Sequence, residues 1–106
     1  TPALSAPVNN SVSPTTSPLL KWTAPTLAPL ASKYQVQIST TNTFTSTVLD
    51  NANVTTNSLT VSPALATGLT YYWRVRSYAS NGHYSTWSAV FKFNIAPDAP
   101  FFAPEI

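Results

Sequence analysis

The chain has 106 residues, enough for one domain that buries about two-thirds of its unfolded surface and needs no metal or disulfide to fold. Charged residues make up only 8% of the sequence, against about 25% in typical domains. The net charge of +2 is too small to indicate a nucleic-acid partner. The absence of cysteine excludes a disulfide framework, a thiolate nucleophile and a thiolate metal site.

No apolar run reaches the length of a membrane span, so membrane insertion is not expected, and no segment resembles a signal peptide. We therefore expect a piece of a longer protein, or a chain from which a leader has been removed. Ser, Thr and Asn occupy most polar positions, and ten prolines stand against two glycines. Thr suits strands, Asn suits turns, and Pro is excluded from helix interiors, so this composition predicts a β-rich domain with many turns.

In the first half of the chain, apolar and polar residues alternate in four segments, which is the pattern of half-buried strands. The segments lie within residues 1–10, 17–23, 33–40 and 46–50. Their inward-facing residues are expected to be Leu4, Val8, Leu20, Trp22, Tyr34, Val36 and Ile38. Turns are predicted at 9–14 and 51–57 and a proline-rich loop at 24–32, and Phe44 is expected to fold over the end of the core.

The second half contains the longest alternating run, Tyr71–Ala79, preceded by a short strand at 58–61. One face of the long strand suits a core and carries Tyr71, Trp73, Val75, Ser77 and Ala79. The other face suits solvent and carries Tyr72, Arg74, Arg76 and Tyr78. Asn81-Gly82 predicts a tight turn, and a last strand is expected over 89–95. The inward residues of the short strand and the last strand are Leu59, Val61, Phe91, Phe93 and Ile95.

Seven short strands separated by turn signals are typical of an all-β sandwich, in which two sheets pack face to face. We expect one domain over residues 1–96. Residues 97–106 contain three prolines and are predicted to be a proline-rich linker or a C-terminal tail.

Several residues resemble the fibronectin type III domain, and most closely its bacterial extracellular members. They are Trp22, Tyr34-x-Val36-x-Ile38, Leu65 six residues before Tyr71, and Trp87-Ser88 followed by Phe91-x-Phe93. The resemblance spans nearly the whole chain and implies a seven-stranded immunoglobulin-like β-sandwich. It also implies that Tyr71 is a corner tyrosine whose hydroxyl bonds to the backbone near Leu65. The structural residues that it implies are Trp22, Tyr34, Leu65, Tyr71 and Trp73. No Arg-Gly-Asp tripeptide is present, so integrin binding is not carried over.

Strand parity turns four of the five basic residues outward. The resemblance implies that their three strands are neighbours in one sheet, so these residues are expected to share one face. The candidate face for a ligand or partner comprises Tyr72, Arg74, Arg76, Tyr78, Tyr84, Trp87 and Lys92, beside Lys33, Gln35 and Gln37. Trp87 can stack there on a guanidinium, as in the Trp–Arg ladder of the cytokine-receptor domains that this Trp-Ser element resembles. Alternation from Phe91 would turn Trp87 inward, so an outward ring requires a bulge near Ser88. The alternative interpretation is that arginine stems and tyrosine rings simply cover the sheet and keep it soluble.

No arrangement of residues predicts catalysis. The side chains suited to acid–base chemistry are Asp50, Asp98, Glu105 and His83. They are too few and too scattered for a carboxylate pair, a Ser-His-Asp triad or a metal site, so we expect no catalytic residue, no metal and no cofactor. The tripeptides that begin at Asn9 and Asn53 match the N-glycosylation pattern, which is common by chance in a chain rich in Asn and Thr.

We expect a non-catalytic structural or spacer module of a secreted or cell-surface protein, whose partners are the neighbouring domains of the same polypeptide. Two other functions are compatible with the sequence. The Tyr/Arg/Trp face suits a module that binds a polysaccharide or a surface protein. Low charge and apolar C-terminal residues suit self-association into a fibre or surface layer.

Overall fold

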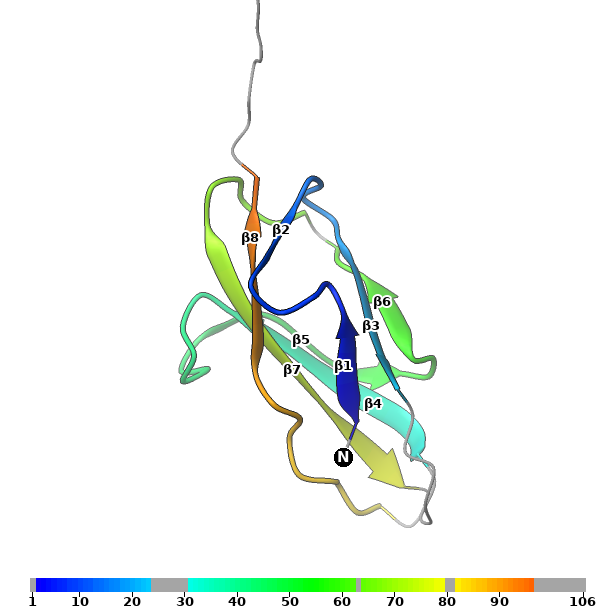
Figure 1. Cartoon of the computed structure of the whole chain (residues 1–106). Helices are drawn as coiled ribbons and strands as arrows, with labels where there is room; N and C mark the ends of the chain where they lie inside the picture. Colours follow the sequence, from blue (N-terminus) through cyan, green and yellow to red (C-terminus); the bar gives the residue numbers. More distant parts are fainter. Residues whose placement is uncertain (1, 24–30, 63, 80–81, 97–106) are drawn as a thin grey trace, which may run out of the picture.

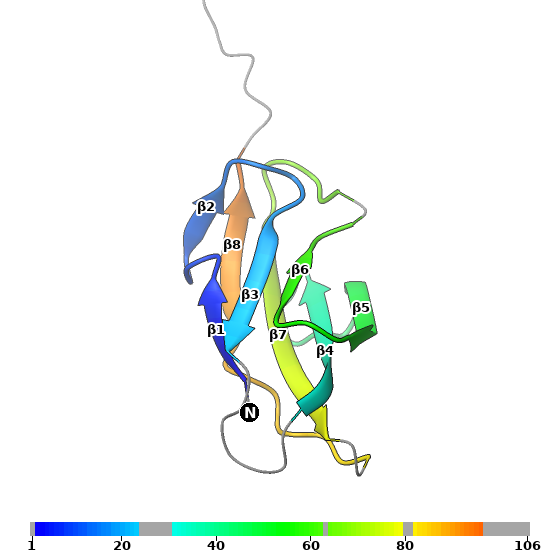
Figure 2. The ribbon, with the colours of Figure 1, turned by 90° about the vertical axis from the view of Figure 1, so that its right-hand side faces the viewer.

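The computed structural model describes residues 2–23, 31–62, 64–79 and 82–96, which form two facing β-sheets (Figure 1). The strands are β1 (Ala3–Ala6), β2 (Ser11–Ser13), β3 (Leu19–Thr23), β4 (Ala31–Ser39), β5 (Thr47–Val54), β6 (Ser58–Thr60), β7 (Thr70–Ala79) and β8 (Phe91–Ile95). One sheet has the order β1-β3-β6, and the other has the order β2-β8-β7-β4-β5. Figure 2 looks onto the β1-β3-β6 sheet, and the larger sheet lies behind it. The predicted all-β sandwich is confirmed.

β7 is the central strand of the larger sheet, and its side chains alternate strictly between two faces. The odd-numbered residues from Tyr71 to Ala79 are buried, whereas the even-numbered residues are half-buried on the outer face. β4 pairs with β7 over almost its whole length, and β8 pairs with its first four residues. This alternation agrees with the prediction.

The core fills the space between the sheets and is rich in aromatic rings. Its buried members are Leu20, Trp22, Tyr34, Val36, Ile38, Val54, Val61, Leu65, Tyr71, Trp73, Val75, Phe93 and Ile95. The Trp22 ring meets Tyr34 edge-on with centroids 5.4 Å apart, a geometry that aromatic pairs favour. Leu4, Leu59 and Phe91 are partly buried against this cluster. With one exception, the residues predicted to face inward do so.

The exception is Val8, and it arises because the N-terminal segment forms two strands where one was predicted. β1 pairs with β3 in one sheet, and β2 pairs in parallel with β8 in the other. The chain crosses between the sheets at residues 7–10. There the Ser11 N–H donates to the Val8 carbonyl, and Asn10 has a φ of 69°. Val8 is 68% exposed because it lies in this crossing turn, so the prediction that it faces inward is wrong.

β5 is longer than predicted. A turn was expected to begin at residue 51, but β5 continues to Val54, which pairs with Tyr34 of β4. The nine-residue β4 offers a backbone partner along this whole stretch, and that pairing overrides the turn preference of the asparagines.

Three predicted features lie outside the described residues. They are most of the loop at 24–32, Asn81 of the predicted turn, and the segment 97–106. Gly82, the other residue of that turn, has a φ of 86° and donates its N–H to the Ala79 carbonyl. Glycine adopts this left-handed conformation without steric cost.

Tyr71 fastens the loop before β7 to the core. Its phenolic oxygen accepts a hydrogen bond of 2.9 Å from the Ala66 N–H, next to Leu65. The Leu65 N–H in turn donates to the Thr16 carbonyl. This is the corner geometry expected from the resemblance.

Replacing Tyr71 with Phe should lower the free energy of unfolding by about 1–3 kcal/mol, because the Ala66 N–H loses its partner. Urea denaturation followed by tryptophan fluorescence measures this change. Tyr72→Phe is the matched control, since its phenol points outward from the same strand. Equal stability losses in the two variants would contradict a special role for the Tyr71 hydroxyl.

Candidate functional site

The outer face of the larger sheet carries most of the residues that the sequence singled out. The cross-strand pairs on this face are Lys33 with Tyr78, Gln35 with Arg76, Gln37 with Arg74, and Tyr72 with Lys92. Because directly opposite residues share one face of a sheet, four of the five basic side chains stand on one surface.

Rings and cations on this face form a continuous stack, which we call the ladder. Its members, in order, are Phe44, Arg74, Trp87, Arg76, Tyr84, Tyr78 and Lys33. The guanidinium carbons of Arg74 and Arg76 lie 4.1 and 4.5 Å from the Trp87 ring centroid. Phe44 lies 4.2 Å from Arg74, and Tyr84 lies 3.8 Å from Arg76. Each guanidinium therefore contacts at least two rings, and Trp87 links the two guanidiniums through cation–π contacts.

Phe44 joins the ladder instead of covering the end of the core, so that prediction is wrong. The residue has a φ of 54° in the loop between β4 and β5. This left-handed backbone is rare for an aromatic residue, and it swings the ring over the outer face.

Trp87 reaches the ladder because residues 83–88 follow the edge of β7 without forming a regular strand. The Ser85 N–H donates to the Ser77 carbonyl (2.8 Å), and the Ser77 N–H donates to the Ser85 hydroxyl (3.0 Å). Ser88 exchanges the same two bonds with Val75, at 2.9 and 3.0 Å. At both places a hydroxyl replaces a backbone carbonyl as acceptor, which frees the segment from the alternation of a strand.

The predicted bulge near Ser88 is present. Ser88 pairs with Val75 and Phe91 pairs with Trp73, so one extra residue lies between Ser88 and Phe91, and Ser88 faces the core while Trp87 faces outward. β8 begins at Phe91, two residues later than predicted.

A hydrogen-bond network connects the arginines to a carboxylate on β5. Arg74 donates through Nε and Nη2 to Gln37 Oε1, at 3.0 and 2.8 Å, and Arg76 Nε donates to Gln35 Oε1 at 2.8 Å. Both glutamines then donate through Nε2 to Asp50, at 2.7 Å from Gln35 and 3.1 Å from Gln37. Two amides thus bridge two cations to one anion. Gln35, on the outer face, is only 8% exposed because this network surrounds it.

The electrostatics of the ladder follow from this crowding. Burial lowers the pKa of Arg74, and the positive charge of Arg76 lowers it further, while Asp50 acts in the opposite direction. The hydrogen bond with Tyr84 is the main cause of a raised pKa at Tyr78. Arginine remains a cation in proteins, so at neutral pH the ladder consists of cations and neutral rings.

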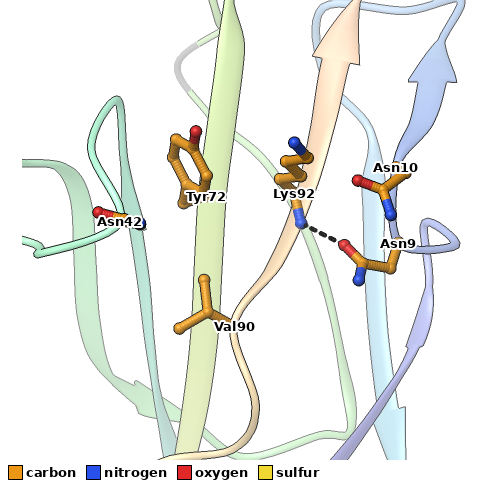
Figure 3. Close-up of a pocket in the computed structure, with 6 residues that line it drawn as sticks. All are labelled: Asn9, Asn10, Asn42, Tyr72, Val90 and Lys92. Atoms are coloured by element: carbon orange, nitrogen blue, oxygen red, sulfur yellow. Dashed lines mark hydrogen bonds between the residues drawn. The ribbon is translucent and has the colours of Figure 1, made fainter.

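Two residues of the predicted face, Tyr72 and Lys92, stand outside the ladder and line a groove. The groove encloses about 230 Å³, and its lining residues are Asn9, Asn10, Asn42, Tyr72, Val90 and Lys92. Figure 3 shows Tyr72 and Lys92 on adjacent strands, between Asn42 on one side and Asn9 and Asn10 on the other. The predicted face is thus divided into a ladder and a groove.

The described residues offer no arrangement for acid–base or metal chemistry. Asp50 is held by two glutamine amides, and His83 lies in the turn after β7, where its carbonyl accepts the Ala79 N–H. In the described ranges, no three His, Cys, Asp or Glu side chains gather as metal ligands. Asp98 and Glu105 lie outside these ranges. The described part of the chain also has no helix of the length and hydrophobicity that would span a bilayer.

Sequence reasoning missed several residues of this face. Gln35 and Gln37 were predicted to lie on this face, but their bonds to the arginines depend on the strand register, which places them opposite Arg76 and Arg74. Phe44 and the three groove asparagines lie in loops and turns, where no periodicity indicates which way a side chain points.

Replacing Trp87 with Ala should lower the free energy of unfolding by about 1–2 kcal/mol, since the ring contacts two guanidiniums at about 0.5–1 kcal/mol each. Leu69→Ala is the control, because Leu69 is 46% exposed and lies outside the ladder. Chemical denaturation monitored by circular dichroism measures both variants. If the two lose equal stability, the ladder is not a stabilising element.

Comparison with known proteins identifies relatives of this chain. Residues 8–97 match the family described as Rha78A-like, N-terminal immunoglobulin domain. No curated protein matches the sequence. Among solved structures, α-L-rhamnosidase of Streptomyces avermitilis, complexed with L-rhamnose, superimposes with a TM-score of 0.70 and 22% identity. The match covers 91% of this chain but only 11% of the rhamnosidase chain.

Two smaller proteins show the same fold. The fibronectin type III domain of human fibronectin type III domain containing protein 3 has a TM-score of 0.69 and 22% identity, over 94% of this chain and 88% of that one. An Fn3-like protein from Clostridium thermocellum has a TM-score of 0.61 and 28% identity, over 86% of this chain and 95% of that one. These similarities confirm the predicted fibronectin type III-like fold, although the described residues form eight strands where seven were predicted. The chain belongs to the family of Rha78A-like N-terminal immunoglobulin domains.

Proposed function

We propose that this domain is a non-catalytic structural module that links and spaces neighbouring domains of a larger secreted or cell-surface protein. The observation that carries the proposal is the position of its ends. The start of β1 lies at one end of the sandwich and the end of β8 at the other (Figures 1 and 2). A ten-residue strand such as β7 extends about 33 Å, so a domain connected through such ends adds length between its neighbours.

The family supports this proposal. Its description places the domain at the N-terminus of Rha78A-like proteins, and the matched region of the Streptomyces avermitilis enzyme is a small part of a long chain. The substrate of that enzyme belongs to that protein, and we do not extend it to this one. For the domain limits, we propose a module over residues 1–96 and a proline-rich linker over 97–106.

The ladder supports a structural role in a second way. The guanidinium groups of Arg74 and Arg76 already contact rings and glutamine amides of the same chain. A cation with its contacts satisfied internally has little to gain from an external ligand, because binding would break existing bonds. The ladder therefore stabilises the fold and covers the sheet.

The parallel pairing of β2 with β8 suits a module that transmits tension. Force applied at the two ends of the domain first loads β1, which pairs with β3, and once β1 is detached it pulls β2 and β8 in opposite directions along their axes. Their hydrogen bonds are then loaded together, including those from the Asn10 N–H to the Lys92 carbonyl (2.8 Å) and from the Ala96 N–H to the Ser13 carbonyl (2.9 Å). Shear of this kind resists extension better than opening the bonds one at a time.

Ala96→Pro should lower the mean unfolding force in single-molecule stretching, because it removes the donor of one loaded bond worth about 0.5–1.5 kcal/mol. The following residue is already Pro97, so the backbone at 96 is already extended. Thr56→Val is the matched control. It removes one hydrogen bond, to the Ser58 carbonyl, away from the loaded strands. A lower force for Thr56→Val with no change for Ala96→Pro would refute the role of the β2–β8 pairing.

The chain should release no product from aryl glycosides, including aryl α-L-rhamnosides, in an assay sensitive enough to detect slow turnover. The reason is that the described acid–base groups do not converge. Chromogenic substrates incubated with the purified chain and with His83→Ala test this. Turnover that His83→Ala abolishes would overturn the non-catalytic assignment.

A further inference from the structure

We infer that the groove beside the ladder binds one uronate unit of an acidic polysaccharide. This inference goes beyond the structural role proposed above and rests on different residues. The ladder has internal partners for its cations, whereas the groove combines a flat ring, a cation and amide groups around one concave space (Figure 3).

Tyr72 provides the surface on which a sugar ring can stack. In the described part of the chain, no ring or cation stacks on Tyr72, although Tyr78 and Tyr84 on the same face are both stacked. The C–H groups of a pyranose carry partial positive charge and are attracted to the negative face of an aromatic ring. The groove, with a volume of about 230 Å³, has room for a single sugar ring.

Lys92 indicates that the ligand is an anion. It stands directly opposite Tyr72 and is the charged residue among the six that line the groove. Asp50, the carboxylate within the described residues, is bonded to the two glutamines under the ladder. A ligand carboxylate would therefore meet a cation with no neighbouring anion in the groove, which favours a uronate over a neutral hexose.

The asparagines hold the wall of the groove in place and supply hydrogen bonds for sugar hydroxyls. Asn9 Oδ1 accepts the Lys92 N–H at 2.9 Å, and the Asn10 N–H donates to the Lys92 carbonyl at 2.8 Å. These two bonds fasten the turn at 9–10 to β8. The Asn9 bond uses its carbonyl oxygen and leaves its NH2 group as a donor. Asn42 contributes an amide from the opposite side. Because this wall is already ordered, binding loses little conformational entropy.

The test is an NMR titration of the 106-residue chain with uronate tetrasaccharides from polygalacturonate, alginate and hyaluronan. At least one of them should cause saturable shifts, at millimolar concentrations, in the side-chain amides of Asn9, Asn10 and Asn42 and in the Tyr72 ring. Methyl-esterified tetragalacturonate keeps the sugar rings and removes the charge. If tetragalacturonate is the ligand, its ester should bind about fivefold more weakly.

Variants locate the site. Lys92→Gln and Tyr72→Ala should each weaken binding by about fivefold or more. Lys21→Gln is the matched charge control, because Lys21 is exposed on β3 of the other sheet. Tyr84→Ala is the ladder control, since Tyr84 contacts Arg76 and does not line the groove. Both controls should bind normally, and amide spectra show whether each variant is folded.

Four results would each overturn the inference. The first is no saturable shift with any of the three uronates, and the second is equal weakening by Lys21→Gln and Lys92→Gln, which indicates non-specific charge attraction. The third is a loss of binding in Tyr84→Ala equal to that in Tyr72→Ala, which places the ligand on the ladder. The fourth is that acetate binds as tightly as the uronates, which would show that the groove recognises a carboxylate and not a sugar. None of these outcomes affects the force measurement that tests the structural role.

Discussion

The alternation of side chains along β7 is the constraint on which both faces of the larger sheet depend. The same strand sends Tyr71, Trp73 and Val75 into the core and Arg74 and Arg76 to the outer face. A register shift of one residue would bury both guanidiniums and expose the aromatic rings, so the two faces specify the register together. Pairing with β4 on one side and β8 on the other fixes this arrangement.

The ladder provides the contacts that allow two arginines to lie side by side despite the repulsion between their charges. A guanidinium is planar, so it can lie over an aromatic ring and donate in-plane hydrogen bonds at the same time, which an ammonium group cannot do. Arg74 uses both modes, toward Trp87 and toward Gln37. The glutamines connect to Asp50, which offsets part of the repulsion between the cations. A lysine at position 74 or 76 could not stack on a ring and donate in-plane hydrogen bonds at the same time.

Strand periodicity was sufficient to predict the sandwich and the core residues of β3, β4 and β7. The shared face of the basic residues also needed the strand neighbours implied by the fibronectin type III resemblance. It failed wherever backbone groups bond in another way. Val8 is exposed because the chain changes sheets, and Phe44 leaves the core because its backbone is left-handed. The period of two alone would also turn Trp87 inward, and the bulge predicted near Ser88 turns it outward. These outcomes depend on three-dimensional partners that a period of two does not encode.

The serine-bonded segment after β7 also explains why the outer face is divided. β8 pairs with β7 only over residues 70–73, and beyond that point residues 83–88 follow the β7 edge and bring Trp87 and Tyr84 over the arginines. Tyr72 lies in the part that β8 pairs, and its half-buried ring stacks on no ring or cation of the described residues. A fold that covered Tyr72 as it covers Arg76 would need a shorter β8, without the pairing of Lys92 with Tyr72. The length of β8 thus sets both the extent of the ladder and the existence of the groove.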